Sequence, residues 1–111
     1  MFKKAAVRRI TWPVTVNIPQ DDGKTQAAEF DCEFELLGIR EHDDLIGSGA
    51  DLLVRVLVGW SRLMNEAGDA PVDFSEAEKA AMLDIAYVRA ALTQAYYEAA
   101  HGNKAKRKNS R

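Results

Sequence analysis

Two stretches near the N-terminus alternate between apolar and polar residues, and this pattern predicts a β-hairpin. Alternation with a period of two and many β-branched residues is typical of half-buried strands. The apolar face of residues 7–18 consists of Ile10, Trp12, Val14, Val16 and Ile18. The apolar face of residues 26–36 consists of Ala28, Phe30, Cys32, Phe34 and Leu36. Residues 19–24 contain Asp22-Gly23 and form the predicted turn. Because an isolated hairpin is marginal in water, we expect helices to cover this apolar face.

Pro13 interrupts the first of these strands. Proline has no backbone N–H to donate to a neighbouring strand, so we expect an edge strand or a bulge at this position.

The polar face of the second strand carries a row of carboxylates at alternate positions, Glu29, Asp31, Glu33 and Glu35. Such a row could bind a cation or a basic partner. However, neighbouring side chains on one strand face diverge and lie about 7 Å apart, whereas a metal site needs ligands that converge. We therefore interpret the row as a solvated sheet face, partly neutralised across the hairpin by Arg9.

The rest of the chain has helical periodicity. Residues 41–46 predict a short helix, and the apolar residues 50–58 predict a buried helix, with a short buried strand as the alternative. Ser75 and Glu78 form a capping box that opens a helix over residues 76–86. Its predicted inner face consists of Ala77, Ala81, Met82 and Ile85.

The helical pattern continues to His101, and Gly102 is a natural residue to follow a helix end. The inner face of this last part consists of Val88, Ala91, Leu92, Ala95, Tyr96 and Ala99. A bend near Ala86-Tyr87 would divide two helices, although no proline forces one.

The length of 111 residues supports one domain. We expect residues 1–101 to form a single α+β domain, an N-terminal antiparallel β-hairpin packed against three or four α-helices. Residues 1–100 carry all 17 acidic residues and 10 of the 15 basic ones, so the folded part is acidic. Residues 102–111 are expected to be a disordered basic tail. An acidic body argues against a dedicated nucleic-acid binder.

The chain contains no apolar run near the ~20 residues needed to span a bilayer and no signal-peptide pattern at its start. We therefore expect no contact with membranes. The single cysteine, Cys32, has no partner for an internal disulfide, which fits a reducing compartment.

Residues that could support catalysis are few and scattered. His42 and His101 have no Cys or His neighbour at metal-ligand spacing, which argues against a zinc site. Cys32 lies on the apolar strand face, where a buried and inert thiol is expected. Gly47-Ser48-Gly49 is too short for a phosphate-binding loop. We expect neither an enzyme nor a bound cofactor.

Four aromatic residues are the candidates for partner binding: Trp60, Phe74, Tyr87 and Tyr96. In one interpretation they belong to the core, as aromatic residues at such spacing usually do. In the other, the alanine-rich helices of residues 76–100 form a groove for a helical partner, with Trp60 and Phe74 near its edge.

The order of several short motifs resembles the small tail assembly chaperones of long-tailed bacteriophages and prophages. These motifs are Trp12 to Pro19, Val58-Gly59-Trp60, Pro71-Val72-Asp73-Phe74-Ser75, Ala95 to Ala99, and Lys108-Asn109. The similarity covers nearly the whole chain. It departs from the family pattern at residues 61–66, where the family has a glycine soon after the tryptophan.

The resemblance implies an α+β protein of the host bacterial cytoplasm that is needed to build a tail but is absent from the mature virion. Its implied partners are the tape measure protein, which such chaperones coat, and the tail tube protein, which they recruit. Self-association is left open. The alternatives are a structural tail protein (a tube, terminator or joining subunit) and, more distantly, a small regulatory protein such as an antitoxin.

Overall fold

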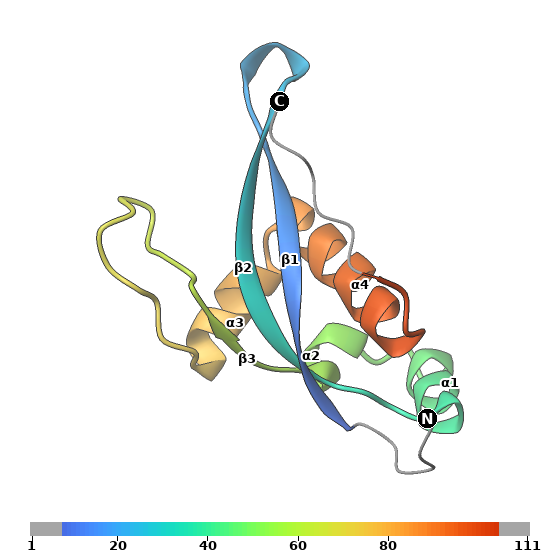
Figure 1. The fold of residues 1–111 in the computed structure, drawn as a ribbon. Helices are drawn as coiled ribbons and strands as arrows, with labels where there is room; N and C mark the ends of the chain where they lie inside the picture. The colour runs from blue at the N-terminus through green and yellow to red at the C-terminus, as the bar shows by residue number, and fades with distance from the viewer. Residues whose placement is uncertain (1–7, 105–111) are drawn as a thin grey trace.

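The computed structural model describes residues 8–104, so residues 105–111 of the predicted tail lie outside the described part. The fold is mixed α+β, with a three-stranded antiparallel sheet and four α-helices (Figure 1). In chain order the elements are β1 (Arg9–Pro19), a 3-10 turn (Asp21–Gly23), β2 (Thr25–Glu35), α1 (Ile39–Gly47), α2 (Leu52–Val56), β3 (Leu57–Ser61), α3 (Glu76–Leu83) and α4 (Ala86–Ala100).

The predicted hairpin is confirmed as β1 and β2. The two strands pair antiparallel with Trp12 opposite Cys32 and Val14 opposite Phe30. At the turn, the backbone φ angles of Asp22 and Gly23 are 66° and 76°, the left-handed region that Asp-Gly sequences adopt readily. The sheet order is β1-β2-β3, so the strand containing Pro13 is an edge strand, as the missing N–H predicts.

The predicted helix over residues 50–58 is confirmed only for Leu52–Val56, and from Leu57 the structure has the strand that we considered as the alternative. Helix α2 covers five residues, and the chain then extends as β3 and pairs antiparallel with β2. The edge of β2 explains this outcome. Its backbone N–H and C=O groups form hydrogen bonds with the backbone of β3, which replace the bonds that a longer helix would form internally. Gly59 lies opposite Glu33, and a Cβ at Gly59 would come within 2.9 Å of Glu33 Oε1.

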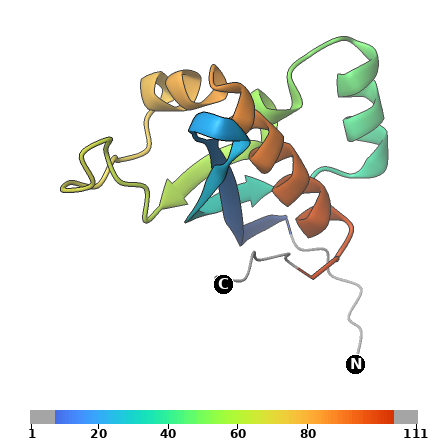
Figure 2. The ribbon, with the colours of Figure 1, turned by 90° about the horizontal axis from the view of Figure 1, so that it is seen from above.

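Helices α3 and α4 lie together on one side of the sheet (Figure 2). The core between them consists of Val14, Val16, Phe30, Cys32, Phe34, Leu52, Leu53, Val56, Leu57, Leu83, Val88, Leu92, Ala95 and Tyr96. The predicted inner face of α4 is confirmed, since Val88, Leu92, Ala95, Tyr96 and Ala99 are buried.

The predicted inner face of the helix over residues 76–86 is confirmed for Met82 and Ile85, which are partly buried against the core, and wrong for its two alanines. Ala77 and Ala81 are exposed, and the buried residues are Lys79 and Leu83. The buried lysine is accommodated because its Nζ donates hydrogen bonds to the backbone carbonyls of Val54 and Leu57, 2.7 Å away in each case. The capping residue is correctly predicted, because the Ser75 hydroxyl accepts a hydrogen bond from the backbone N–H of Glu78.

Helix α1 is longer than the predicted helix over residues 41–46 and contains no buried residue. Its His42 Nε2 lies 2.7 Å from the Tyr97 hydroxyl on α4, and this hydrogen bond links α1 to α4. Within residues 8–104, none of the helices combines the length and apolar character that crossing a membrane requires.

Candidate partner-binding groove

An open, largely apolar groove of about 740 Å³ lies where three separate segments meet. These segments are the distal half of the hairpin, the loop of residues 62–66 and the corner between α3 and α4. The residues that line this groove are Val16, Ile18, Ala28, Glu29, Phe30, Arg62, Leu63, Met64, Asn65, Glu66, Met82, Ile85, Tyr87 and Val88. It is referred to below as the groove.

The hairpin supplies the first wall because it extends past the helices that cover its lower half (Figure 1). Val16 and Phe30 are still buried, whereas Ile18 is only partly covered and Ala28 is exposed. The apolar face of the hairpin therefore continues beyond the core, and its upper part is left for another surface to cover.

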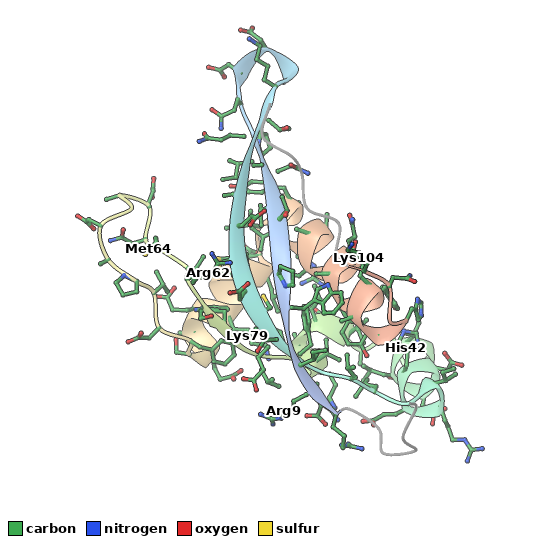
Figure 3. All side chains as sticks on the ribbon, viewed as in Figure 1. Arg9, His42, Arg62, Met64, Lys79 and Lys104 are labelled. Carbon is green, nitrogen blue, oxygen red and sulfur yellow. The ribbon has the colours of Figure 1, made fainter. Side chains whose placement is uncertain are left out.

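The second wall is a loop that leaves β3 and returns to α3. At Arg62 the backbone enters the left-handed region with φ 63°. The loop is held by hydrogen bonds from the backbone N–H of Asn65 to the Ala70 carbonyl (2.8 Å) and from that of Val72 to the Leu63 carbonyl (2.8 Å). It carries Met64, which is 45% exposed. Figure 3 shows Arg62 close to β2 and Met64 farther out on this projecting loop.

The third wall is the corner between α3 and α4. The backbone of Ile85 is extended (φ −98°, ψ 116°), which ends one helix and lets the next begin at Ala86, so the predicted bend is present. Met82 and Ile85 are half-buried at this corner, and Tyr87 is 38% exposed. Flexible and partly exposed apolar side chains therefore line two of the three walls.

The structure separates the four predicted partner-binding residues. Only Tyr87 lines the groove. Trp60 and Phe74 contact each other edge-to-face, with ring centroids 4.8 Å apart, and the Trp60 Nε1–H donates to the Val72 carbonyl at 2.8 Å. This pair joins the two ends of the loop between β3 and α3. Tyr96 is 1% exposed, and its hydroxyl accepts a hydrogen bond from the Leu37 N–H, so it is a core residue.

The rim of the groove is polar, and its one arginine is already paired. The Arg62 guanidinium donates two hydrogen bonds to the Asp31 carboxylate, at 2.8 and 3.0 Å. This contact raises the pKa of Arg62. Glu29 and Glu66 also line the groove. The charge of Glu29 likewise acts to raise the pKa of Arg62, so the charged side chains of the lining interact with one another.

The row of carboxylates on the sheet face is engaged by arginines, as we expected in part. The Glu35 carboxylate lies 3.2 Å from Arg55, 3.6 Å from Arg8 and 3.9 Å from the predicted partner Arg9. A hydrogen bond from Arg55 is the main cause of the lowered pKa of Glu35. Across residues 8–104, His, Cys, Asp and Glu side chains form no group of three that could hold a metal ion.

Sequence reasoning missed the polar residues that join the helices. Arg89 on α4 donates to both carboxylate oxygens of Asp51 (2.9 Å each) and to the Leu83 carbonyl at the end of α3. Asp51 in turn accepts from the Leu53 N–H and so caps α2. For Lys79, the only signal in the sequence was its spacing of four residues from Leu83, which places both on one helix face.

The chain matches none of the protein-family models, curated proteins or solved structures with which it was compared.

Proposed function

We propose that this protein is a tail assembly chaperone of a long-tailed bacteriophage or prophage. In this proposal it binds the tape measure protein in the host bacterial cytoplasm, helps to recruit tail tube subunits, and is left out of the mature virion. The observation that carries the proposal is the groove, an apolar surface that the fold builds but does not cover. The resemblance of the sequence motifs supplies the identity of the partner.

The side chains of the groove suit a chaperone. Met64 and Met82 have unbranched, polarizable side chains that adapt to partners of different shape. A chaperone that coats a long chain must hold many different segments of it, so an adaptable surface is more useful than a closely fitted one.

The test is co-expression of the full chain with the tape measure protein of the same phage or prophage. The readouts are the solubility of the tape measure protein and its recovery when the chaperone is pulled down. We expect it to become soluble and to co-purify. We also expect mature particles to lack this protein.

A matched pair of variants links the result to the groove. Met64→Ser makes the groove wall polar, and Ile39→Ser makes the same kind of change on α1, where Ile39 is 81% exposed. Met64→Ser should lose the tape measure protein and Ile39→Ser should keep it. If the tape measure protein stays insoluble and this protein forms rings or occurs in virions, it is a structural tail protein and the proposal is wrong.

A further inference from the structure

We infer that an extended segment of the partner chain binds to this protein as a further strand of its sheet. The segment lies antiparallel along the edge of β2 at residues 25–30, referred to below as the open edge, and fills the groove with large apolar side chains at every second position. This inference rests on the proposed function for the origin of the segment, and on the sheet and the groove for its conformation and chemistry.

The open edge exists because β3 ends before β2 does. Strand β3 pairs only with residues 31–34 of β2, so no described strand pairs with residues 25–30 on this side. At Arg62 the backbone enters the left-handed region, and the chain leaves the sheet. The loop that follows forms backbone hydrogen bonds with its own returning limb, as from Asn65 to Ala70. The line that β3 begins is therefore not continued beside residues 25–30.

The register shows which backbone groups of β2 point to the open edge. The hydrogen bonds at the two ends of the hairpin join even-numbered residues, from the Leu36 N–H to the Arg8 carbonyl and from the Gln20 N–H to the Lys24 carbonyl. The pairing between these ends has no register shift, so the even-numbered residues of β2 bond to β1 and the odd-numbered ones point the other way. Thr25 and Ala27 therefore present N–H and C=O groups at the open edge, and both residues are exposed.

An extended segment satisfies these groups with its own backbone, as in other cases of strand addition. A segment that continues the line of β3 runs antiparallel to β2, which is the slightly more stable pairing. Its residues opposite Thr25 and Ala27 exchange hydrogen bonds with them and keep their side chains on the outer face of the sheet. Its residues opposite Gln26 and Ala28 point their side chains to the helix side, where the groove lies.

The groove sets the chemistry of these inward-pointing side chains. Ala28 is small and exposed, so the sheet leaves space on this side. The facing walls carry Met64, which is exposed, and Met82 and Ile85, which are half-buried. Large apolar side chains at alternate positions would remove these walls from water, whereas the intervening positions lie on the solvated face. The ligand is therefore an extended segment that alternates large apolar and polar residues.

The ends of the chain itself do not supply such a segment. Residues 105–111 are basic and contain no apolar side chain larger than alanine. Residues 1–7 precede Arg8, which is bonded to Leu36, and seven extended residues reach at most about 24 Å. The open edge lies roughly 20–36 Å from Leu36 along β2, so residues 1–7 cannot run along it.

A second copy of this chain is also a poor occupant. If two open edges paired with each other, Gln26 and Ala28 of one copy would point into the groove of the other, and neither is a large apolar residue. The border of β1 lacks an N–H at Pro13 and Pro19, two of the odd-numbered positions that point outward. Neither strand of a second copy would both pair with the open edge and fill the groove.

The experiment uses the full chain and fluorescein-labelled synthetic peptides of equal length, with binding measured by fluorescence anisotropy. The first peptide alternates leucine and threonine. The second carries N-methyl groups on its threonine nitrogens, and the third carries them on its leucine nitrogens. In the antiparallel strand the threonine N–H groups donate to the open edge and the leucine N–H groups point away from it. Only the second peptide therefore loses its hydrogen bonds to β2.

We expect the second peptide to bind at least about tenfold more weakly than the first, and the third to bind as tightly as the first. A helix, or a peptide held by side chains alone, would respond alike to methylation at either set of positions. Equal binding of the two methylated peptides, or tighter binding of the second, would overturn the inference.

A matched pair of proline variants tests the position of the peptide. Ala27→Pro removes an N–H of the open edge, and Asn17→Pro removes the N–H of the directly opposite residue, on the other border. Neither change removes a bond between β1 and β2, because both residues are odd-numbered. Ala27→Pro should weaken binding of the first peptide about tenfold, and Asn17→Pro should leave it unchanged. Equal effects would overturn the inference, as would a wild-type dimer in sedimentation that Ala27→Pro dissociates, because the open edge would then belong to a second copy.

These outcomes are distinct from those of the co-expression test. If the tape measure protein co-purifies but methylation of the threonine nitrogens has no effect, the inference fails and the proposed function stands. If the peptides bind as expected but the tape measure protein does not co-purify, the proposed function fails and binding at the open edge stands.

Discussion

Lys79 is the most informative residue to change for stability. Its side chain is 6% exposed, and its Nζ donates to the carbonyls of Val54 and Leu57, at the end of α2 and the start of β3. These carbonyls lie where the chain switches from helix to strand, so no continuing helix supplies their hydrogen-bond donors. The buried ammonium therefore stabilises the junction that lets β3 join the sheet.

The expected loss of stability follows from the interactions that Lys79→Met would remove. Hydrogen bonds to a charged group each contribute about 1.5–3 kcal/mol, and burying the ammonium costs several kcal/mol in return. Methionine avoids that cost and fills similar space, but it removes the donor of the buried Leu57 carbonyl and of the part-buried Val54 carbonyl. The loss is about 1–3 kcal/mol for the buried carbonyl and less for the other. The two carbonyls belong to the backbone, so no substitution removes them. The cost of leaving them without a donor should therefore exceed the gain from no longer burying the ammonium. We expect the free energy of unfolding to fall by about 2–4 kcal/mol.

The assay is urea unfolding followed by circular dichroism, with Lys24→Met as the control. Lys24 is exposed in the hairpin turn, so this control removes the same charge without removing a buried contact. With a melting shift of roughly 4 °C per kcal/mol for a domain of this size, Lys79→Met should melt about 8–16 °C below the wild-type protein. The reasoning is refuted if Lys79→Met is as stable as Lys24→Met.

Three further predictions concern the sheet and the loop. Because the folded pKa of Glu35 is lowered, its stabilising contribution is present above its unfolded pKa and is lost as pH falls through the folded value. Glu35→Gln should therefore be less stable than the wild-type protein at pH 7. In urea titrations the difference should begin to shrink as pH falls below the unfolded pKa of about 4.3 and vanish below the lowered folded pKa; a difference independent of pH would contradict this. Trp60→Phe should cost about 1 kcal/mol by removing the bond to the Val72 carbonyl, and Trp60→Ala about 3 kcal/mol by also removing the ring contact with Phe74. Equal melting temperatures for the two variants would show that the ring contact contributes nothing. Burial raises the pKa of the Cys32 thiol, so a thiol reagent should label it only at the rate of unfolding, and rapid labelling in native buffer would show that the site opens.

Local signals in the sequence were enough to predict the hairpin, the edge position of its first strand and the helix cap at Ser75. Each of these depends on neighbouring residues: alternation, the missing N–H of Pro13, and a hydroxyl three residues before Glu78. The strand β3 could not be predicted with the same certainty, because five residues become a strand only when β2 offers them a free edge.

The candidate site could be predicted only in part, because it too depends on contacts between segments that are far apart in the sequence. Tyr87 was identified from its type, but the groove needs segments around residues 16–30, 62–66 and 82–88 to converge, and no local pattern encodes that. Lys79 was missed because its partners lie 22 and 25 residues away. Trp60 and Phe74 were predicted near the edge of a groove formed by the helices of residues 76–100; in the structure they contact each other and do not line the groove.

Pro13 has a consequence for how this protein behaves among other chains. An open sheet can grow by accepting a further strand, and the eleven residues of β1 form the longer of its two borders. The proline interrupts the row of N–H donors near the middle of that border, and the opposite border, β3, is only five residues long. The proline therefore makes β1 a poor template for an incoming strand. On the opposite side, β3 pairs only with residues 31–34 of β2 and leaves the edge of residues 25–30 uncovered. An incoming strand is thus directed to that short segment of β2 and away from the long border.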